Sequence, residues 1–372
     1  MNAQEIPTYL SSCLLPLWAD AALDRRHGGF CSRLSGTLEP IASDSKRVLV
    51  QTRLLWTFSD AARSGGDPRF RRIADELFDF LLERCRDEKG GGWFATLTHA
   101  GEPLDATKDT YIHAFVLYSL AGYFLLSGET RARDEALRTT QVLDEKLGDA
   151  NGRGYLEAAS RDWLPERGIR RQNPHMHLLE AFLALYEATD EGVYLLRAQQ
   201  IVQLFKEVFF ESGSGILREF FETDWSVSAN EGHRLEPGHH FEWVWLLHEY
   251  ARLSGDESVL DDARNLFAAG SERGIDRELG GVFDEVDEVG RVLRDTKRIW
   301  PQTEYLRAAG LLDPNQVPEI LKRCGARYVD PEHRGWYEQT DRAGAVIERT
   351  MNASSVYHIY GALRSVASLS RG

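Results

Sequence analysis

Cysteine is scarce in this chain of 372 residues, which contains four cysteines and no CxxC pair. Cysteines scattered in this way exclude a disulfide framework, and their spacing does not match that of cysteine ligands to a metal. Isolated thiols are typical of a protein that folds in a reducing compartment. The sequence therefore predicts a cytoplasmic protein with buried thiols at Cys13, Cys31, Cys85 and Cys324.

Positive charge is also in short supply, because 44 Lys and Arg residues are outnumbered by 58 Asp and Glu residues, for a net charge of −14. A protein without a positive field cannot replace the counterions that surround nucleic-acid phosphates. We therefore expect no nucleic-acid partner and interpret the acidity as a solvated surface.

Long apolar runs are missing, and residues 1–24 have no basic segment and are interrupted by Pro7, Pro16 and Asp20. These features predict neither a signal peptide nor a membrane span. The hydrophobic fraction of 42% and the charged fraction of 27% are those of a soluble globular protein with a sizeable core.

The sequence does have an internal repeat. Glycine followed by an aromatic or aliphatic residue recurs at nearly even spacing, at Gly29, Gly92, Gly154, Gly215, Gly281 and Gly335. Alternating residues and a polar turn follow each glycine, which predicts a short β-hairpin. Even spacing over this distance is typical of folds that repeat one supersecondary unit.

Turn signals lie between the glycines, at residues 64–68, 127–130, 189–192, 254–257 and 312–315. Apolar residues at helical spacing flank these turns, as Phe70, Ile73 and Leu77 do after the first of them. Each repeat therefore predicts a hairpin, a helix, a turn and a second helix. The helices that follow hairpins are expected to begin near residues 45, 107, 173, 237, 298 and 353.

The ends of the chain lack the polar capping repeats that a solenoid needs. A helix over about residues 6–23 is expected to complete a ring with the last helix. The sequence thus predicts an all-α (α/α)6 barrel, a six-hairpin toroid with short β-hairpins in its loops. We expect it to be a single catalytic domain over residues 1–372.

Polar residues recur near the starts of the helices that follow hairpins. Their spacing along the chain nearly equals that of the glycines, and the residues are Arg53, His113, His177, His239, Glu304 and His358. Residues at equivalent positions in the repeats of a closed ring lie at the same height around its axis. We therefore expect these side chains to face one concave pocket. A lone histidine is more often a core or surface residue, which we favour for His175, His240 and His248. For His113 the pocket and the core remain open alternatives.

Histidines at helix N-termini suit acid–base chemistry. The helix dipole disfavours imidazolium there, so we expect these side chains to be neutral near pH 7, the form that a general base requires. Glu242 follows His239 by three residues, and Glu180 follows His177 by three. Residues at this spacing share a helix face, so each carboxylate is expected to orient its histidine.

Metal ligation is the alternative for closely spaced histidines such as His175 with His177 or His239 with His240. Adjacent positions project about 100° apart on a helix, and the sequence contains no HExxH pattern. We therefore expect no metal and no cofactor.

These motifs resemble the N-acylglucosamine 2-epimerase superfamily, over essentially the whole chain. The motifs are Arg53, Tyr111 in KDTYIHAF, Asn173 and His177 in NPHMHLLEA, His239 and Glu242 in EPGHHFEW, Trp300 in WPQTE, and His358 in VYHIYGA. The resemblance implies the (α/α)6 fold and metal-free catalysis on the open-chain sugar, by deprotonation at C2 to an enediol-type intermediate.

The resemblance also implies residue roles. Its two acid–base histidines match His239 and His358, a third histidine that assists ring opening matches His177, and an arginine that stabilises the intermediate oxygen matches Arg53. The predicted catalytic residues are His239, His358, His177, Arg53 and Glu242. The predicted substrate-binding residues are Tyr111, Asn173, Trp300, Gln302, His113 and Glu180.

The segment VYHIYGA looks more like the mannose isomerases than the epimerases of the superfamily, so we predict interconversion of D-mannose and D-fructose. One alternative is C2 epimerisation of a mannose, cellobiose or N-acylglucosamine type of sugar. Another is glycoside hydrolysis with Glu242 and Glu304 as the carboxylate pair. A third is sugar binding without turnover, through Trp300 and Trp336. The predicted partner is a small monosaccharide, with no membrane partner, and the sequence gives no oligomeric state.

Overall fold

The computed structural model describes residues 2–41, 45–166 and 168–369. The chain divides into two compact units. The amino-terminal unit consists of Trp18–Leu34 and Glu39–Leu204, and the carboxyl-terminal unit consists of the residues up to Leu17, Ser35–Leu38 and the residues from Phe205 onward. The single domain over residues 1–372 that the repeat predicts stays a prediction.

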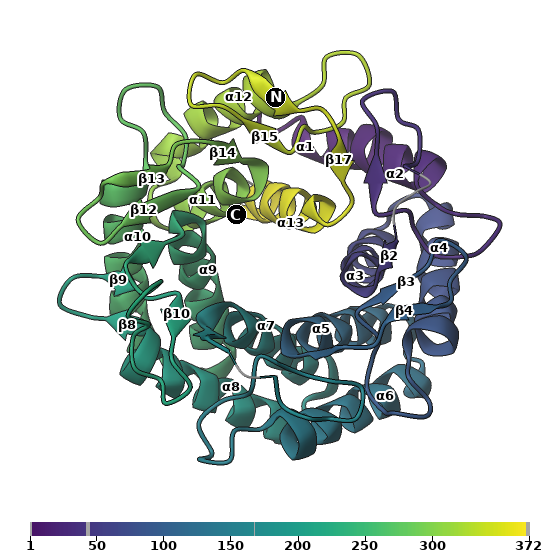
Figure 1. The fold of residues 1–372 in the computed structure, drawn as a ribbon. Helices are drawn as coiled ribbons and strands as arrows, with labels where there is room; N and C mark the ends of the chain where they lie inside the picture. Colours follow the sequence, from purple (N-terminus) through teal and green to yellow (C-terminus); the bar gives the residue numbers. More distant parts are fainter. Residues whose placement is uncertain (1, 42–44, 167, 370–372) are drawn as a thin grey trace. The chain divides into compact units, whose positions relative to one another are not determined.

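Three long helices lie side by side in the amino-terminal unit (Figure 1). They are α3 (Val48–Arg63), α5 (Thr110–Ser127) and α7 (Gln172–Thr189). A shorter helix follows each and packs against it, namely α4 (Pro68–Phe80), α6 (Thr130–Val142) and α8 (Gly192–Leu204). The predicted apolar stripe of α4 is buried, including Phe70, Ile73 and Leu77.

The carboxyl-terminal unit repeats this pattern with α9 (Pro237–Ser254), α11 (Ile299–Leu312) and α13 (Ser355–Leu369). Helix α10 (Val259–Gly274) packs on α9, and α12 (Val317–Tyr328) packs on α11. The short α1 (Ile6–Tyr9) lies beside α13, where the Tyr9 hydroxyl donates to the carbonyl of Arg334 at 2.6 Å. The boundary between the two units falls within α2 (Leu15–Ala21).

The predicted helix starts are confirmed, because α3, α5, α7, α9, α11 and α13 begin within three residues of them. All five predicted turns separate consecutive helices. Asp67 caps α4 by accepting a hydrogen bond from the Arg69 amide at 2.8 Å. Gly128 and Gly255 end α5 and α9 in the left-handed conformation, with φ of 67° and 76°.

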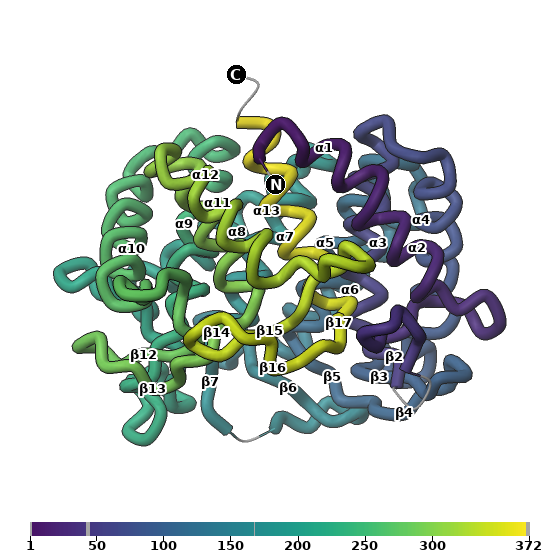
Figure 2. Tube along the Cα trace, turned by 90° about the horizontal axis from the view of Figure 1, so that it is seen from above, coloured from purple at the N-terminus to yellow at the C-terminus, as the bar shows by residue number. Residues whose placement is uncertain are grey.

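The strands are short and lie at one end of the helices in each unit (Figure 2). Those of the amino-terminal unit are β1 (Arg33–Leu34), β2 (Lys46–Arg47), β3 (Thr96–Leu97), β4 (Pro103–Asp105), β5 (Lys108–Asp109), β6 (Ala158–Ala159) and β7 (Arg170–Arg171). Its antiparallel sheets have the orders β2-β3-β4 and β5-β6.

Those of the carboxyl-terminal unit are β8 (Phe210–Glu211), β9 (Ile216–Leu217), β10 (Phe220–Phe221), β11 (Arg234–Leu235), β12 (Glu285–Asp287), β13 (Val292–Arg294), β14 (Lys297–Arg298), β15 (Gln339–Thr340), β16 (Val346–Glu348) and β17 (Met351–Asn352). Its antiparallel sheets have the orders β8-β9, β11-β12-β13 and β14-β15-β16.

The repeat glycines lie in loops, as predicted, but the residue after the glycine usually does not begin a hairpin. In five of the six repeats it forms a single bridge back to the residue that follows the preceding helix, as Trp93 does with Arg86 and Val282 with Ile275. The hairpins β3-β4, β12-β13 and β15-β16 begin a few residues later. The glycine therefore marks the junction between a helix and the next hairpin.

At Gly29, Gly92, Gly154 and Gly281, the fourth residue of the following helix lies where a side chain at the glycine would be. A Cβ at Gly154 would lie 2.7 Å from His175 Nε2, and that nitrogen accepts a hydrogen bond from the Tyr155 amide at 2.9 Å. The Nδ1 of the same ring donates to the Arg171 carbonyl at 3.2 Å. The fourth positions of α3, α5, α9, α11 and α13 hold Gln51, His113, His240, Gln302 and His358. Gln51, His240 and Gln302 accept a hydrogen bond from a loop amide as His175 does, so this position fastens a loop to a helix in four repeats.

A buried ion pair recurs with the same period. It joins an aspartate five residues before the repeat glycine to a lysine in the strand that leads into the next helix. The pairs are Asp24–Lys46, Asp87–Lys108 and Asp276–Lys297, with N···O distances of 2.7, 2.9 and 2.8 Å. Buried ion pairs therefore recur along the chain with the repeat, as the apolar residues do.

Lys108→Met is expected to lower the free energy of unfolding by about 3 kcal/mol, because Asp87 would lose a partner in a buried site. Arg161 still contacts Asp87 at 2.8 Å, which keeps the loss at the low end of the range for broken buried pairs. The control is Arg84→Met, whose pair with Glu102 is exposed and contributes at most about 1 kcal/mol. Urea unfolding compares the two variants, and equal losses would contradict the role assigned to Lys108.

One described helix, α5, is long and apolar enough to cross a membrane by length and composition, with a mean hydropathy of 1.3. The expectation that no run approaches a membrane span is therefore wrong for this helix. The helix packs between α3 and α7, and 67% of it is buried within the protein. A core helix passes the same test, so the feature is weak evidence for a membrane span.

The four cysteines are free, and Cys31, Cys85 and Cys324 are buried as predicted. Cys13 is only half-buried, which corrects the prediction for that residue. Burial raises the pKa of the Cys324 thiol to about 12, so this side chain stays protonated and unreactive near neutral pH.

Candidate active site

The sixth position of five helices that follow hairpins holds a buried side chain, and in four of these helices that side chain is polar. Counting from the first residue of α3, α5, α7, α9 and α11 gives Arg53, Phe115, His177, Glu242 and Glu304. All five side chains are buried. In α3, α7, α9 and α11 the fourth position instead holds the loop-fastening residues described above, whereas the fourth residue of α13 is His358, which contacts Glu304.

Two predicted substrate-binding residues belong to the fourth position. The amide of Gln302 accepts a hydrogen bond from the Val282 N–H and donates to the Val282 carbonyl, each at 2.8 Å. His113 is fully buried, and its Nδ1 donates to the Asp109 carbonyl at 2.7 Å. These bonds turn the amide of Gln302 and the Nδ1 of His113 toward the backbone, and they favour the core alternative for His113.

His239, the third residue of α9, is held by a carboxylate that the sequence analysis missed. Its Nδ1 lies 2.9 Å from Oε2 of Glu219, in the connection between β9 and β10. Both side chains are buried, at 4% and 2% exposed. Because an ionised carboxylate only accepts hydrogen bonds, this contact favours a hydrogen on Nδ1 of the His239 ring.

The pKa of the His239 imidazole is raised by its neighbours. Burial alone lowers the pKa of the imidazole, but the negative charges of Glu219 and Glu236 outweigh burial and raise it above its usual value. This direction is opposite to the one expected from the helix dipole alone. A carboxylate at hydrogen-bond distance acts more strongly than the partial charge of a helix terminus.

His358 of α13 has the same arrangement with a different partner. Its Nδ1 lies 2.7 Å from Oε1 of Glu304 on α11. Glu304 is fully buried, and its other oxygen lies 3.9 Å from the Arg307 guanidinium. Glu242, the predicted partner of His239, also lies in this group, since ligand atoms of Glu242, Glu304 and His358 all lie within 4.8 Å of one another.

Trp300 lies against both of these histidines. Its ring centroid is 5.0 Å from that of His239 and 5.7 Å from that of His358. Trp300 is partly exposed, and the guanidinium of Arg298 lies 5.3 Å from its ring centroid. The carboxyl-terminal unit therefore brings together two imidazoles, each fixed through Nδ1, on one indole ring.

The amino-terminal unit contains a second group of predicted residues. Arg53 donates to the Tyr111 hydroxyl at 2.7 Å, and its guanidinium lies 4.3 Å from the Phe115 ring centroid. His177 contacts Tyr111 and Phe115, with centroid distances of 5.0 and 4.5 Å. Its Nδ1 lies 3.1 Å from Glu180 Oε2, which confirms the predicted orienting carboxylate. The predicted Asn173 is the second residue of α7 and is partly exposed.

Two clusters of the described residues have the composition of metal sites. One is the buried Glu242–Glu304–His358 group, and the other is a half-buried group of Asp24, His27 and His99 in the amino-terminal unit. Neither was anticipated, because the ligands come from separate elements. In the first cluster Arg307 already supplies positive charge, and in the second Lys46 contacts Asp24 at 2.7 Å.

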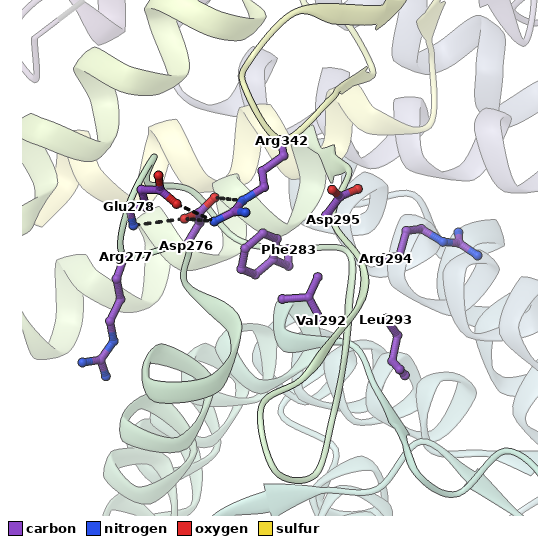
Figure 3. Close-up of a pocket in the computed structure, with 9 residues that line it drawn as sticks. All are labelled: Asp276, Arg277, Glu278, Phe283, Val292, Leu293, Arg294, Asp295 and Arg342. Atoms are coloured by element: carbon purple, nitrogen blue, oxygen red, sulfur yellow. Dashed lines mark hydrogen bonds and ion pairs between the residues drawn. The ribbon is translucent and has the colours of Figure 1, made fainter.

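A hollow of about 610 Å³ on the surface of the carboxyl-terminal unit is separate from these residues (Figure 3). Its lining includes Phe283, Val292 and Asp276, and Arg342 pairs with Asp276 at 3.0 Å across it. None of the predicted site residues lines this hollow.

Buried histidines at the fourth helix position give stability a pH dependence. Burial lowers the pKa of His113 and His175 to about 4 and that of His240 to about 3, against about 6.5 in an unfolded chain. Below pH 6.5 the unfolded chain binds protons that the folded protein does not bind. The free energy of unfolding is therefore expected to fall as the pH falls from about 6.5 toward 4.

His175→Gln tests this expectation. Glutamine already occupies the same position in two other helices, at Gln51 and Gln302. Removing this titration should reduce the stability lost between pH 7.5 and pH 5 by about 2 kcal/mol, measured by urea unfolding at both pH values. His248→Gln is the control, because His248 is half-buried on the far part of α9. An unchanged loss in His175→Gln would refute the assignment.

Comparison with known proteins identifies the family of this chain. The family model for N-acylglucosamine 2-epimerase matches residues 28–362. The chain belongs to this family. A mannose-6-phosphate isomerase of Rhizobium meliloti is 31% identical over 98% of this chain and 96% of its own length. A cellobiose 2-epimerase of Bacteroides fragilis is 28% identical over 81% of this chain and 79% of its own length. A D-mannose isomerase of Thermobifida fusca is 28% identical over 92% of this chain and 89% of its own length.

A solved cellobiose 2-epimerase from Bacillus thermoamylovorans has a TM-score of 0.90 and 21% identity, covering 100% of this chain and 99% of that one. This likeness shows the fold, which is the predicted (α/α)6 barrel with short strands in its loops. The family and the named relatives show that this member of the N-acylglucosamine 2-epimerase family is a sugar isomerase or epimerase.

Proposed function

We propose that this protein interconverts D-mannose and D-fructose by proton transfer through an enediolate. The observation that carries the proposal is the pair His239 and His358, two buried imidazoles that contact Trp300. Each is bonded through Nδ1 to a buried carboxylate from another element. Two bases with defined reacting nitrogens are what a proton transfer between adjacent carbons requires.

The reaction balances without a cofactor. An imidazole Nε2 takes the C2 proton of the open-chain aldose, and the electron pair of the C–H bond remains in the enediolate. Delivery of a proton to C1 and transfer of the O2 proton to O1 then give the ketose. His239 and His358 are assigned to these carbon and oxygen proton transfers.

The remaining roles fall to side chains that bind charge and hydroxyl groups. Arg53 is assigned to the enediolate oxygen, and His177 with Glu180 to ring opening. Tyr111, Asn173 and Trp300 are assigned to sugar contacts. Gln302 and His113 are left out of the site, because their polar atoms already hold the backbone.

A neutral sugar is favoured over a sugar phosphate. Around His239 and His358 the described residues of the carboxyl-terminal unit place four carboxylates, from Glu219, Glu236, Glu242 and Glu304, against the guanidinium groups of Arg298 and Arg307. A net negative surrounding repels a phosphate dianion. The name of the Rhizobium meliloti relative nevertheless makes mannose 6-phosphate a substrate to test.

Epimerisation at C2 is the second candidate, because it shares the enediolate and is supported by the cellobiose 2-epimerase relative. Glycoside hydrolysis is disfavoured, since Glu304, one of its two carboxylates, already contacts the His358 ring at 2.7 Å and lies 3.9 Å from the Arg307 guanidinium. A neighbouring cation favours the ionised carboxylate, whereas a glycosidase needs one carboxyl group that keeps its proton. Binding without turnover does not account for two carboxylate-fixed histidines.

Product analysis tests the proposal. The purified protein is incubated separately with mannose, mannose 6-phosphate, glucose and cellobiose, and the products are resolved by chromatography. We expect fructose from mannose at the highest kcat/KM. Epimers without ketose would replace the isomerase by the epimerase, and phosphorylated ketose as the main product would overturn the choice of a neutral sugar.

Metal independence is a further expectation. Arg307 provides positive charge beside Glu304, so the Glu242–Glu304–His358 cluster does not need a cation to balance its carboxylates. Activity is expected to stay within about twofold after exhaustive treatment with a chelator, at the precision of a standard rate assay. Loss of activity that one added divalent ion restores would contradict the metal-free mechanism.

We also propose that the two units form one catalytic domain that acts in the cytoplasm on a small sugar, without a nucleic-acid or membrane partner. The acidic composition and the four free thiols support this assignment.

A further inference from the structure

Several contacts fix the position of Glu219, although this residue lies outside any helix. The backbone N–H of Leu217 donates to His240 Nε2 at 3.1 Å, which fastens this loop to α9. Side chains two residues apart in an extended segment point to the same side, so Glu219 faces α9 as Leu217 does. Arg218, between them, points away and pairs with Glu211 and Glu288. The loop is thus fixed on one histidine while its carboxylate meets the next, His239.

Glu219 departs from the pattern of the other repeats. Acidic side chains in the same part of three other hairpin loops hold the entrance of the next helix, rather than an imidazole. Glu157 accepts from the Arg171 amide at 3.1 Å, Asp284 from the Arg298 amide at 2.8 Å, and Glu338 from the Ser355 hydroxyl at 2.7 Å.

The partner of Glu219 departs from the pattern as well. The third position of α9 holds His239, whereas the third positions of α3, α5, α7 and α11 hold Val50, Ile112, Pro174 and Pro301. In this one repeat, both the acidic loop residue and the third helix residue therefore differ from those of the other repeats. A coupled change of two contacting residues indicates a task beyond holding the fold.

The charged groups around His239 come from several elements. Glu236 precedes α9, Arg298 lies in β14, and His240 and Glu242 follow on α9 itself. Glu236 already contacts Arg298 at 3.0 Å. Glu219 is the carboxylate at hydrogen-bond distance from the His239 ring, and its charge contributes the largest upward effect on the pKa of His239 against the downward effect of burial.

We propose that Glu219 is the positioning residue of His239, fixing the Nδ1–H tautomer so that Nε2 exchanges the proton with the sugar carbon. This inference rests on the proposed proton-transfer function. When Nε2 takes the proton, the C–H bond breaks and an N–H bond forms, while Nδ1 keeps its own hydrogen toward Glu219. The resulting imidazolium is stabilised by the ionised carboxylate, and no proton passes to Glu219.

The test compares Glu219→Gln and Glu219→Asp with Glu135→Gln. Glu135 is an equally buried carboxylate on α6 that pairs with Arg86 and Arg138, outside the proposed site. Glu219→Gln is expected to lower kcat by about 10–100-fold, the usual cost of losing the partner that orients a functional histidine. KM should change little. Glu219→Asp should recover part of the rate, and Glu135→Gln should reduce stability without lowering kcat.

The pH profile and the histidine spectrum separate positioning from a structural role. Without the Glu219 charge the pKa of His239 falls, so the acidic limb of kcat against pH should move to lower pH in Glu219→Gln. Nitrogen NMR of the ring, assigned with His239→Asn, should show the same fall and, in the unaltered protein, the Nδ1–H tautomer. The spectrum of the unaltered protein decides the tautomer even if Glu219→Gln does not fold.

The outcomes are distinct. An Nε2–H tautomer in the unaltered protein, or a folded Glu219→Gln with unchanged His239 pKa and kcat, would overturn the positioning role. An unaltered protein that converts none of the tested sugars would overturn the proposed function. The NMR result would still decide whether Glu219 sets the tautomer of His239.

Discussion

Replacement of His239 or His358 by Asn is expected to lower kcat by about 10²–10⁴-fold, which is the usual contribution of general acid–base catalysis. Asn keeps a polar side chain of similar reach but cannot take up a proton near neutral pH. Both histidines are at most 6% exposed and touch Trp300 at its ring. The loss should therefore be in the chemical step, with little change in KM. Steady-state kinetics on the substrate identified by product analysis measure both constants.

The matched control is His248→Asn on the same helix as His239. His248 donates from Nδ1 to the carbonyl of Val244 at 2.7 Å and is half-buried, like many histidines without a catalytic task. We expect this variant to keep nearly all of its activity. A His239→Asn or His358→Asn enzyme that retains more than about a tenth of kcat would remove that residue from the proton-transfer pair.

Arg53→Ala is expected to lower kcat by about 10²–10³-fold, because the guanidinium is assigned to the negative oxygen that develops in the enediolate. Arg53 is 4% exposed and is aimed by the Tyr111 hydroxyl at 2.7 Å and by the Phe115 ring. Its charge is therefore oriented before substrate binds. Arg53→Lys should recover only part of the rate, since an ammonium group lacks the planar pair of donors.

Arg63→Ala is the control for Arg53, at the end of the same helix. Its pair with Asp60 has an N···O distance of 3.0 Å, and the side chain is 48% exposed. This variant should match the unaltered enzyme in kcat. If Arg53→Ala raised KM and left kcat unchanged, Arg53 would bind the sugar equally in the ground and transition states, and its role at the enediolate would be refuted.

Much of the fold could be predicted because the repeat is a physical requirement. Gly154 leaves room for His175, and His175 must meet the amide of Tyr155. Gly29, Gly92 and Gly281 approach the fourth residue of the following helix in the same way, so the spacing survives in these repeats. The detailed pairing after each glycine could not be predicted, since a single bridge and a two-stranded hairpin produce the same alternation of residues.

The site was only partly predictable because the phase of a long repeat is uncertain by a residue or two. His113 and Phe115 lie two positions apart on α5, which is a rotation of about 200° on a helix. The first faces the loop and the second faces His177. The period does not distinguish them, since the spacing of the repeat glycines itself varies, being longer from Gly215 to Gly281 than from Gly281 to Gly335. Gln302 was assigned to the sugar for the same reason.

Glu219 was missed because its partner lies 20 residues away, in a different element. Spacing rules for helices find local partners such as Glu180 for His177, and they suggested Glu242 for His239 on the same grounds. The one available signal was the acidic residue that recurs soon after the repeat glycine, as at Glu157, Asp284 and Glu338.

Hydrogen exchange during turnover tests the central claim, proton transfer by His239 and His358, most directly. Mannose is converted in deuterated water by the unaltered enzyme, and the fructose is examined by NMR for deuterium at C1. We predict deuterium at C1, together with loss of conversion in His239→Asn and His358→Asn. Complete transfer of the C2 hydrogen to C1 without exchange, combined with an active His239→Asn or His358→Asn enzyme, would contradict proton transfer and indicate a hydride shift.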